Sequence, residues 1–244
     1  MDIRPSKAIG TLLAIAVHLY TASGSVIALL ILFALVEKNF ASAFFWTFVA
    51  TMVDYTDGTL ARLFRIKNFL PRVEGLLLDA AVDFVVNVFL SVFLLARAGL
   101  LPDPKLFWCG VIFISSLYRF SNYEPDIGKG FFCGFPPIFT FWAFYIFYFV
   151  PSTPAIALLL GLYALLCFVH TGYIHAARFN RWRLVNSLLL GTWWLVYLLI
   201  TQDMVEHKHL WLVASLAYPL YYFAVSWYFF YRLRRQNSDL PHRV

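Results

Sequence analysis

Long runs of apolar residues, separated by short polar segments, make up most of this chain. Eight of these runs have roughly the 20 residues that a helix needs to cross a lipid bilayer. They lie at about residues 11–36, 41–63, 75–96, 105–122, 131–150, 154–175, 184–201 and 210–231. The pattern predicts an all-α fold, a polytopic membrane helix bundle of about eight transmembrane helices. The loops are short, so residues 1–244 are expected to form a single membrane domain.

The composition supports a membrane protein and excludes an ordinary soluble domain. Hydrophobic residues make up 61% of the chain and charged residues only 13%, whereas soluble proteins carry about 25% charged residues. The net charge of +6 suits contact with anionic lipid surfaces, and nothing in the sequence indicates a nucleic-acid partner. The three cysteines, Cys109, Cys133 and Cys167, lack the spacing of a disulfide framework or a zinc site.

Basic residues predict the orientation of the chain. When both termini are placed in the cytoplasm, 15 of the 19 Lys and Arg residues fall on the cytoplasmic side. The four on the opposite side are Lys38, Arg97, Lys105 and Lys208. Cytoplasmic loops of membrane proteins carry such an excess of Lys and Arg. We therefore expect a multi-pass protein of the cell inner membrane with both termini in the cytoplasm.

Two of the apolar runs contain acidic residues, Asp54 and Asp57 in one and Asp79 and Asp83 in the other. Ionisable groups at membrane depth are costly and mark functional sites by default. The members of the first pair are three residues apart and those of the second pair four, so each pair lies on one helix face, one turn apart. The four carboxylates are therefore expected to point into one pocket at the cytoplasmic ends of the second and third helices.

A divalent cation would relieve the repulsion among these carboxylates. Oxygen-only ligands favour a hard ion such as Mg²⁺ or Mn²⁺, which proteins hold with a few carboxylates and substrate phosphates. The small residues Gly58, Ala61 and Gly75 would let helices approach closely and leave room for a substrate. The guanidinium group of Arg62 could hold a phosphate oxygen.

The order of these residues resembles the signature of the CDP-alcohol phosphotransferase family. The pattern D-x-x-D-G-x-x-A-R, then G-x-x-x-D-x-x-x-D, is matched at Asp54, Asp57, Gly58, Ala61, Arg62, Gly75, Asp79 and Asp83. The twelve-residue spacer 63–74 and the stretches 17–24 and 131–136 are similar to bacterial members that use choline. The chain departs from those members after Pro136, where it reads Pro-Ile-Phe-Thr instead of Ser-Tyr-Trp-Asn.

The resemblance implies an enzyme that transfers the phosphatidyl group of CDP-diacylglycerol to choline and releases CMP, with its active site facing the cytoplasm. It implies two divalent metal ions, Mn²⁺ or Mg²⁺, and a homodimer. Asp83 would be the catalytic base. The implied metal ligands are Asp54, Asp57, Asp79 and Asp83, and the implied substrate-binding residues are Asp54, Gly58, Ala61, Arg62 and Gly75.

Two alternatives stay open on the sequence alone. The acceptor could be another alcohol, such as serine, inositol or glycerol phosphate. A phosphorylated acceptor would call for further cationic groups, for which Arg119, Lys129 and Arg178 are candidates. The chain could also be a cation-coupled transporter that uses its aspartates as ion sites. A transporter should carry such acids near the bilayer midplane, whereas these cluster at one membrane face beside an arginine.

Overall fold

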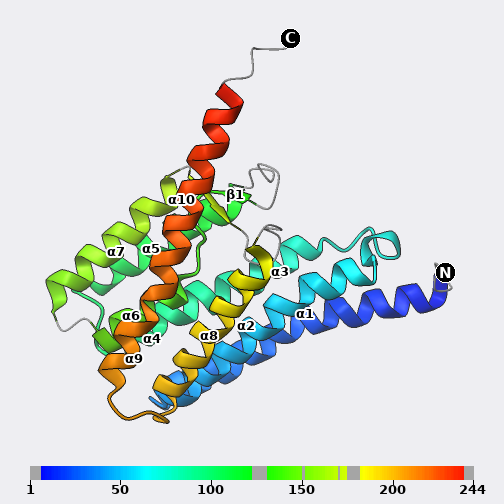
Figure 1. Ribbon diagram of the computed structural model, residues 1–244. Coiled ribbons are helices and arrows are strands. Elements are labelled where there is room, and N and C mark those ends of the chain that lie inside the picture. Colours follow the sequence, from blue (N-terminus) through cyan, green and yellow to red (C-terminus); the bar gives the residue numbers. More distant parts are fainter. Residues whose placement is uncertain (1–6, 123–130, 150–151, 170, 175–181, 239–244) are drawn as a thin grey trace. The chain divides into compact units, whose positions relative to one another are not determined.

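The computed structural model describes residues 7–122, 131–149, 152–169, 171–174 and 182–238 (Figure 1). Most of these residues are helical. The helices are α1 (Lys7–Val36), α2 (Phe40–Leu63), the 3-10 helix η1 (Ile66–Asn68), α3 (Gly75–Asp83), the π-helix η2 (Phe84–Phe89), α4 (Leu90–Arg97), α5 (Lys105–Ser121), α6 (Phe139–Phe149), α7 (Thr153–Phe168), α8 (Arg183–Thr201), α9 (Lys208–Ser215) and α10 (Ala217–Ser238). The strands are β1 (Phe131–Cys133) and β2 (Gly172–Ile174).

Every predicted apolar run contains a helix, and the all-α prediction is confirmed. The run predicted at 75–96 is a continuous helical stretch made of α3, η2 and α4. Within the part of the chain that the structure describes, four helical stretches are long and apolar enough to cross a membrane: Lys7–Val36, Gly75–Arg97, Leu184–Thr201 and Lys208–Arg232. Helix α2 has 24 residues but carries Asp54, Asp57 and Arg62 in its second half.

The chain forms two units, which we describe separately. The first comprises Met1–Leu100 and Phe139–Phe144, and the second comprises Leu101–Ile138 and Tyr145–Val244. All four signature aspartates belong to the first unit. The expectation that the whole chain acts as a single membrane domain stays a prediction.

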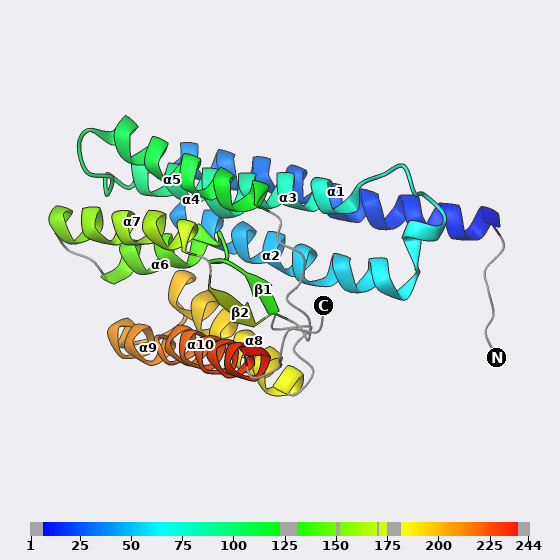
Figure 2. The same cartoon turned by 90° about the horizontal axis from the view of Figure 1, so that it is seen from above.

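In the first unit, α1 presents a face of mostly small residues to its neighbours. Figures 1 and 2 show α1 and α2 running side by side, and α1 also contacts η1, α3 and α4. Spacings of three and four residues separate the main buried positions of α1, as in helix pairs that cross at a shallow angle. These positions are Gly10, Ala14, Val17, Thr21, Gly24, Ala28, Ile31 and Leu35.

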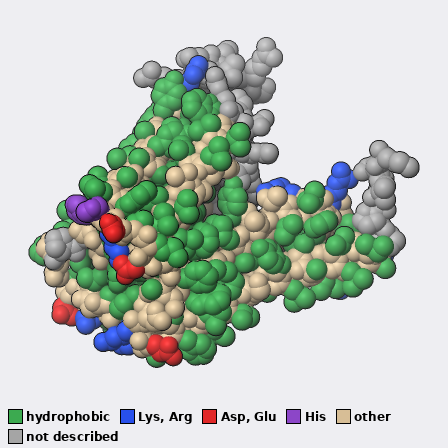
Figure 3. All heavy atoms as spheres, turned by 60° about the horizontal axis from the view of Figure 1, so that its bottom comes forward, with side chains coloured by type: hydrophobic (Ala, Val, Ile, Leu, Met, Phe, Trp, Pro, Cys, Tyr) green, Lys and Arg blue, Asp and Glu red, His purple; other side chains and the backbone are tan. Residues whose placement is uncertain are grey.

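The opposite face of α1 carries large apolar side chains that remain exposed. Leu12 is 66% exposed and Phe33 is 59% exposed, and Leu19 and Val26 are similarly open. Hydrophobic side chains cover most of the face drawn in Figure 3. A helix that is apolar all round, with its smallest residues buried and its largest exposed, is typical of a lipid-facing span. The protein is therefore a membrane protein.

The predictions of helices over 131–150 and 154–175 are wrong at one end of each run. Residues 131–133 and 172–174 pair instead as antiparallel strands, with Phe132 opposite Tyr173. Pro136 and Pro137 delay the start of α6, because proline lacks an N–H and disfavours a helical conformation in the residue before it. Residues 169–174 are rich in β-branched and aromatic residues, which favour extended backbone.

In the second unit, α10 covers β2. Ile174 packs against Tyr222, Val225 and Phe229. The Ile174 N–H donates a hydrogen bond to the Ser226 hydroxyl over 3.2 Å, and its carbonyl accepts one from the Tyr222 hydroxyl over 3.1 Å. These side chains satisfy backbone groups that an edge strand would otherwise expose.

Candidate active site

Helices α2 and α3, which carry the four aspartates, both pack against α1, and so does the segment that connects them. Ile66 of η1 is buried against Ala14 and Val17 of α1, and Phe69 and Leu70 pack against this cluster. The turn therefore folds back onto α1, and α3 begins beside it. At the far end of α4, Arg97 donates hydrogen bonds to the carbonyls of Leu35 and Val36, which end α1.

Three of the four predicted carboxylates meet at one point. Asp54, Asp57 and Asp79 each offer an oxygen atom, and these oxygens all lie within 4.8 Å of one another. Asp57 is buried, and the other two are half-buried. The Asp54 and Asp79 carboxyl groups approach within hydrogen-bonding distance. Carboxylates this close repel each other unless a cation or a proton lies between them.

The donor set fits a hard divalent cation. All three donors are carboxylate oxygens, the ligand type that Mg²⁺ and Mn²⁺ prefer. Oxygens on opposite sides of Mg²⁺ lie about 4.2 Å apart, because each binds at about 2.1 Å. A separation of at most 4.8 Å is close to this value. Asp54, Asp57 and Asp79 could therefore hold one ion after a small inward movement of their side chains.

Asp83 lies beside this cluster without being part of the three-carboxylate group. It is half-buried, and its charge interacts with those of Asp79 and Asp57. The Asn87 side-chain nitrogen donates a hydrogen bond to Asp83 Oδ1 over 2.8 Å. The four acids therefore have two different surroundings. Three carboxylates converge on one another, and the fourth, Asp83, accepts a hydrogen bond from the Asn87 amide.

Asp57 is held from two helices. The Thr21 side chain of α1 and the Gly58 backbone N–H both interact with its carboxyl group, and the Thr21 hydroxyl also donates a hydrogen bond to the Val17 carbonyl over 3.3 Å. Close by, the Tyr20 and Thr56 hydroxyl groups are 2.8 Å apart and join α1 to α2 a second time. The small residues along α1 allow this approach, and they fix the acids of α2 against α1.

Arg62 lies over Gly58 at the end of α2. Its side chain is exposed, and its Nη2 donates a hydrogen bond to the Thr59 hydroxyl over 3.1 Å. A Cβ atom on Gly58 would lie 3.3 Å from Arg62 Nη1, so the absence of a side chain there makes room for the guanidinium group. Gly75 has a similar place at the start of α3, where a Cβ atom would lie 3.3 Å from His18 Cε1.

Ala61 has a packing position. It contacts the buried cluster of Ala14, Val17 and Ile66, which anchors the turn between α2 and α3. A larger side chain would push this turn away from α1 and displace the start of α3. The substrate-binding role predicted for Ala61 stays a prediction.

Of the cationic candidates for a phosphorylated acceptor, the structure describes Arg119, which belongs to the second unit. Arg119 donates hydrogen bonds from Nε to the Phe135 carbonyl over 3.2 Å and from Nη1 to the Asn122 carbonyl over 2.7 Å. The Arg119 guanidinium group thus has a structural place in that unit. Lys129 and Arg178 lie outside the described residues.

The hydroxyl groups near the aspartates leave only weak signals in the sequence. Thr21 and Thr140 are small polar residues inside apolar runs, a common occurrence in membrane helices. Thr140 donates a hydrogen bond to Asn87 Oδ1 over 3.1 Å, although 53 residues separate the two in the chain. Thr140 is also the last residue of the stretch in which this chain departs from the family pattern.

Curated relatives share most of the length of the chain. A phosphatidylcholine synthase of Agrobacterium fabrum is 33% identical over 181 residues, which cover 74% of this chain and 75% of that protein. A phosphatidylcholine synthase of Pseudomonas aeruginosa is 34% identical over 205 residues, with 82% and 86% covered. One of Legionella pneumophila is 29% identical over 222 residues, with 87% and 86% covered.

No protein-family model matches the chain. The assignment therefore depends on these relatives, on the signature and on the cluster that the signature forms. The Agrobacterium and Pseudomonas proteins exceed 30% identity over more than two thirds of their own lengths. The chain belongs to the family of bacterial phosphatidylcholine synthases.

Proposed function

We propose that the protein is a membrane enzyme that transfers the phosphatidyl group of CDP-diacylglycerol to choline and releases CMP. The observation that carries this proposal is the convergence of Asp54, Asp57 and Asp79 within 4.8 Å beside Asp83. A diphosphate donor needs positive charge around its oxygens, and a divalent ion held by such a cluster supplies it.

In this proposal, Asp54, Asp57 and Asp79 hold a divalent metal, Mn²⁺ or Mg²⁺, and Asp83 also contributes a ligand to a second ion. The metal, when bound, would neutralise negative charge on the diphosphate. Arg62 would add positive charge next to the diphosphate, because its guanidinium group at the end of α2 can bind a phosphate oxygen. Asp54, Gly58, Ala61 and Gly75 would complete the surface against which the substrate lies.

Asp83 acts as the general base. Its carboxylate takes the proton of the choline hydroxyl while the choline oxygen forms a bond to the phosphorus atom attached to diacylglycerol. The bond between that phosphorus and the bridging oxygen of CMP breaks, and CMP leaves with the electron pair. The apolar surroundings limit competing attack by water on the donor.

We place this enzyme in the cell inner membrane with the acidic cluster facing the cytoplasm. The distribution of Lys and Arg residues supports this orientation, and a nucleotide-bearing donor would reach the site from that side. The family resemblance also leads us to expect a homodimer, which light scattering of the detergent-solubilised protein can check.

The proposal is tested by CMP release from CDP-diacylglycerol with choline, serine, inositol or glycerol phosphate as the only acceptor. We expect rapid release with choline and background release with the others. Release with one of the other alcohols alone would reassign the acceptor and keep the reaction class. An absence of release with all four, from folded protein supplied with Mn²⁺, would refute the proposal and favour a transporter.

A further inference from the structure

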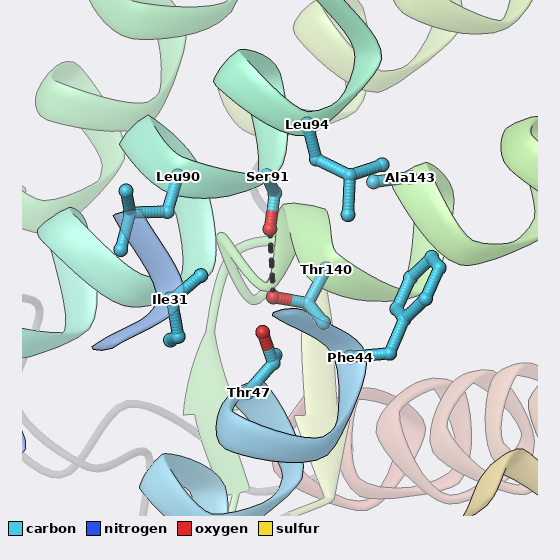
Figure 4. Close-up of a pocket in the computed structure, with 8 residues that line it drawn as sticks. All are labelled: Ile31, Phe44, Thr47, Leu90, Ser91, Leu94, Thr140 and Ala143. Carbon is cyan, nitrogen blue, oxygen red and sulfur yellow. Dashed lines mark hydrogen bonds between the residues drawn. The ribbon is translucent and has the colours of Figure 1, made fainter. Parts of the chain in front are cut away.

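A line of hydrogen bonds runs from the beginning of α6 to the Asp83 carboxylate. The Thr140 hydroxyl donates to Asn87 Oδ1 over 3.1 Å, with the Asn87 backbone carbonyl 3.4 Å away. The Asn87 amide nitrogen in turn donates to Asp83 Oδ1 over 2.8 Å. The Ser91 hydroxyl lies 3.0 Å from that of Thr140 (Figure 4).

These bonds have one consistent direction. Thr140 has a single hydroxyl proton, and if it points to the Asn87 side-chain oxygen, Ser91 must supply the proton of the bond between the two hydroxyl groups. The Asn87 amide then presents its oxygen to Thr140 and its nitrogen to Asp83. Rotating the amide by half a turn would place two oxygens against each other at Asp83. The Asp83 carboxylate, which can only accept, therefore sets which way the amide faces, and the Thr140 hydroxyl anchors the amide oxygen at the other end.

Asp83, Asn87 and Ser91 follow one another along the continuous stretch of α3, η2 and α4, and Asn87 lies in the π-helix η2. Ser91 Oγ lies 3.4 Å from the Val86 carbonyl, five residues earlier in the chain. Asn87 is 8% exposed, Ser91 5% and Thr140 3%. Such π-helical turns occur frequently at functional sites.

The surroundings of this line of bonds are mostly apolar. The small cavity in Figure 4 is lined by Ser91, Thr140 and Thr47 and by the apolar side chains of Ile31, Phe44, Leu90, Leu94 and Ala143. Polar groups buried in such a place cost free energy unless each finds a partner. Hydrogen bonds between membrane helices also serve packing, but this network ends on the carboxylate of Asp83, which packing alone does not require.

We infer that Asn87, anchored by Thr140, is a positioning residue for Asp83. This inference depends on the proposed function, in which Asp83 receives the choline proton. The amide holds Oδ1 in place, so the carboxylate cannot rotate freely, and Oδ2 is left to face the second ion and the choline hydroxyl. Thr140 acts on Asp83 only through Asn87. Because Thr140 is near the start of α6, that helix also helps to position the site.

The test uses Thr140→Val, which keeps the shape of the side chain and removes the hydroxyl. We expect kcat for choline transfer to fall about 10-fold or more, as for other losses of a supporting hydrogen bond. The KM for CDP-diacylglycerol and the affinity for the Mn²⁺ ion held by Asp54, Asp57 and Asp79 should stay within about 2-fold, because those three carboxylates are unchanged. Thr140→Ser, which restores the hydroxyl, should recover most of the lost kcat.

Thr47→Val is the matched control. Thr47 lines the same cavity, is 6% exposed, and donates its hydrogen bond to the Ala43 carbonyl within α2. It is not one of the residues whose hydrogen bonds connect Thr140 to Asp83, so its replacement should leave kcat close to the parent value. Asn87→Ala provides an independent variant: kcat should fall with KM unchanged, and adding Thr140→Val to it should cause little further loss.

Several outcomes would overturn the inference. These are equal kcat values for Thr140→Val and Thr47→Val, a change in Mn²⁺ affinity or KM without a change in kcat, and losses that multiply in the double variant. If Thr140→Val cannot be recovered folded, Asn87→Ala against Thr47→Val decides the question. A parent enzyme that releases no CMP with choline would instead refute the proposed function.

Discussion

A Cβ atom on Gly24 of α1 would lie 2.6 Å from Cγ1 of Val82 on α3. Real side chains do not approach this closely, so glycine at this position sets the distance between α1 and α3. Val82 directly precedes Asp83 and lies three residues after Asp79. The contact therefore determines how far the acids of α3 stand from those of α2, which α1 also holds.

We expect Gly24→Ala to lower activity about 10-fold or more, because displacing catalytic groups by a fraction of an ångström to an ångström costs rates of this order. Gly24→Ala combined with Val82→Ala removes the clashing Cγ1 atom and should restore most of the activity. Gly161→Ala on α7, where a Cβ atom would meet nothing within 4 Å, is the control. Failure of the double variant to recover would show that Gly24 acts in some other way.

Metal dependence follows from the three converging carboxylates. EDTA should abolish CMP release, and Mn²⁺ or Mg²⁺ should restore it. Asp54→Asn, Asp57→Asn and Asp79→Asn should each lower the rate at least ~10²-fold, the scale of a lost electrostatic contact at a reacting centre. Asp203→Asn, at an exposed residue paired with Lys208, should have little effect. Full turnover in metal-free detergent solution would contradict this assignment.

The two acids of α3 should respond differently to the same substitution. Asp79 belongs to the three-carboxylate group, so Asp79→Asn should weaken metal-dependent binding of CDP-diacylglycerol. Asp83→Asn should keep that binding and lose the chemical step, because an amide cannot accept the choline proton. Calorimetry measures the first property and CMP release the second. Equal loss of binding in both variants would remove the distinction between ligand and base.

The orientation of the chain can be tested by cysteine labelling. In a background in which all three natural cysteines are replaced, a cysteine at Asn68 in the exposed turn η1 should react with impermeant reagents only from the cytoplasmic side. A cysteine at Ser152, exposed before α7, should react only from the other side. Labelling of both positions from the same face would contradict the predicted arrangement of eight crossings.

The sequence predicted most of the helices because a bilayer demands long apolar runs. The predicted run 41–63 corresponds to α2 (Phe40–Leu63), and the run 184–201 corresponds to α8 (Arg183–Thr201). The strands at 131–133 and 172–174 were missed because their residues are as apolar as those of the adjoining helices. Their pairing joins residues about 40 positions apart, which hydropathy alone does not reveal.

The site was partly predictable for a similar reason. Spacing along one helix placed Asp54 with Asp57 and Asp79 with Asp83, and the structure brings three of these four together. Asn87 is a polar residue in an apolar run, but its partner Thr140 comes from a distant segment. The π-helical turn that faces Asn87 toward Thr140 leaves no simple periodic pattern in the sequence.

An oxygen isotope measurement follows the bond that the proposed reaction forms between choline and phosphorus. The parent enzyme would be given CDP-diacylglycerol and choline labelled with ¹⁸O in its hydroxyl group, and the products would be analysed by mass spectrometry. Attack of the choline oxygen on the phosphorus attached to diacylglycerol predicts phosphatidylcholine that retains the label and CMP that contains none. Phosphatidylcholine without the label, labelled CMP, or no phosphatidylcholine at all would contradict the account.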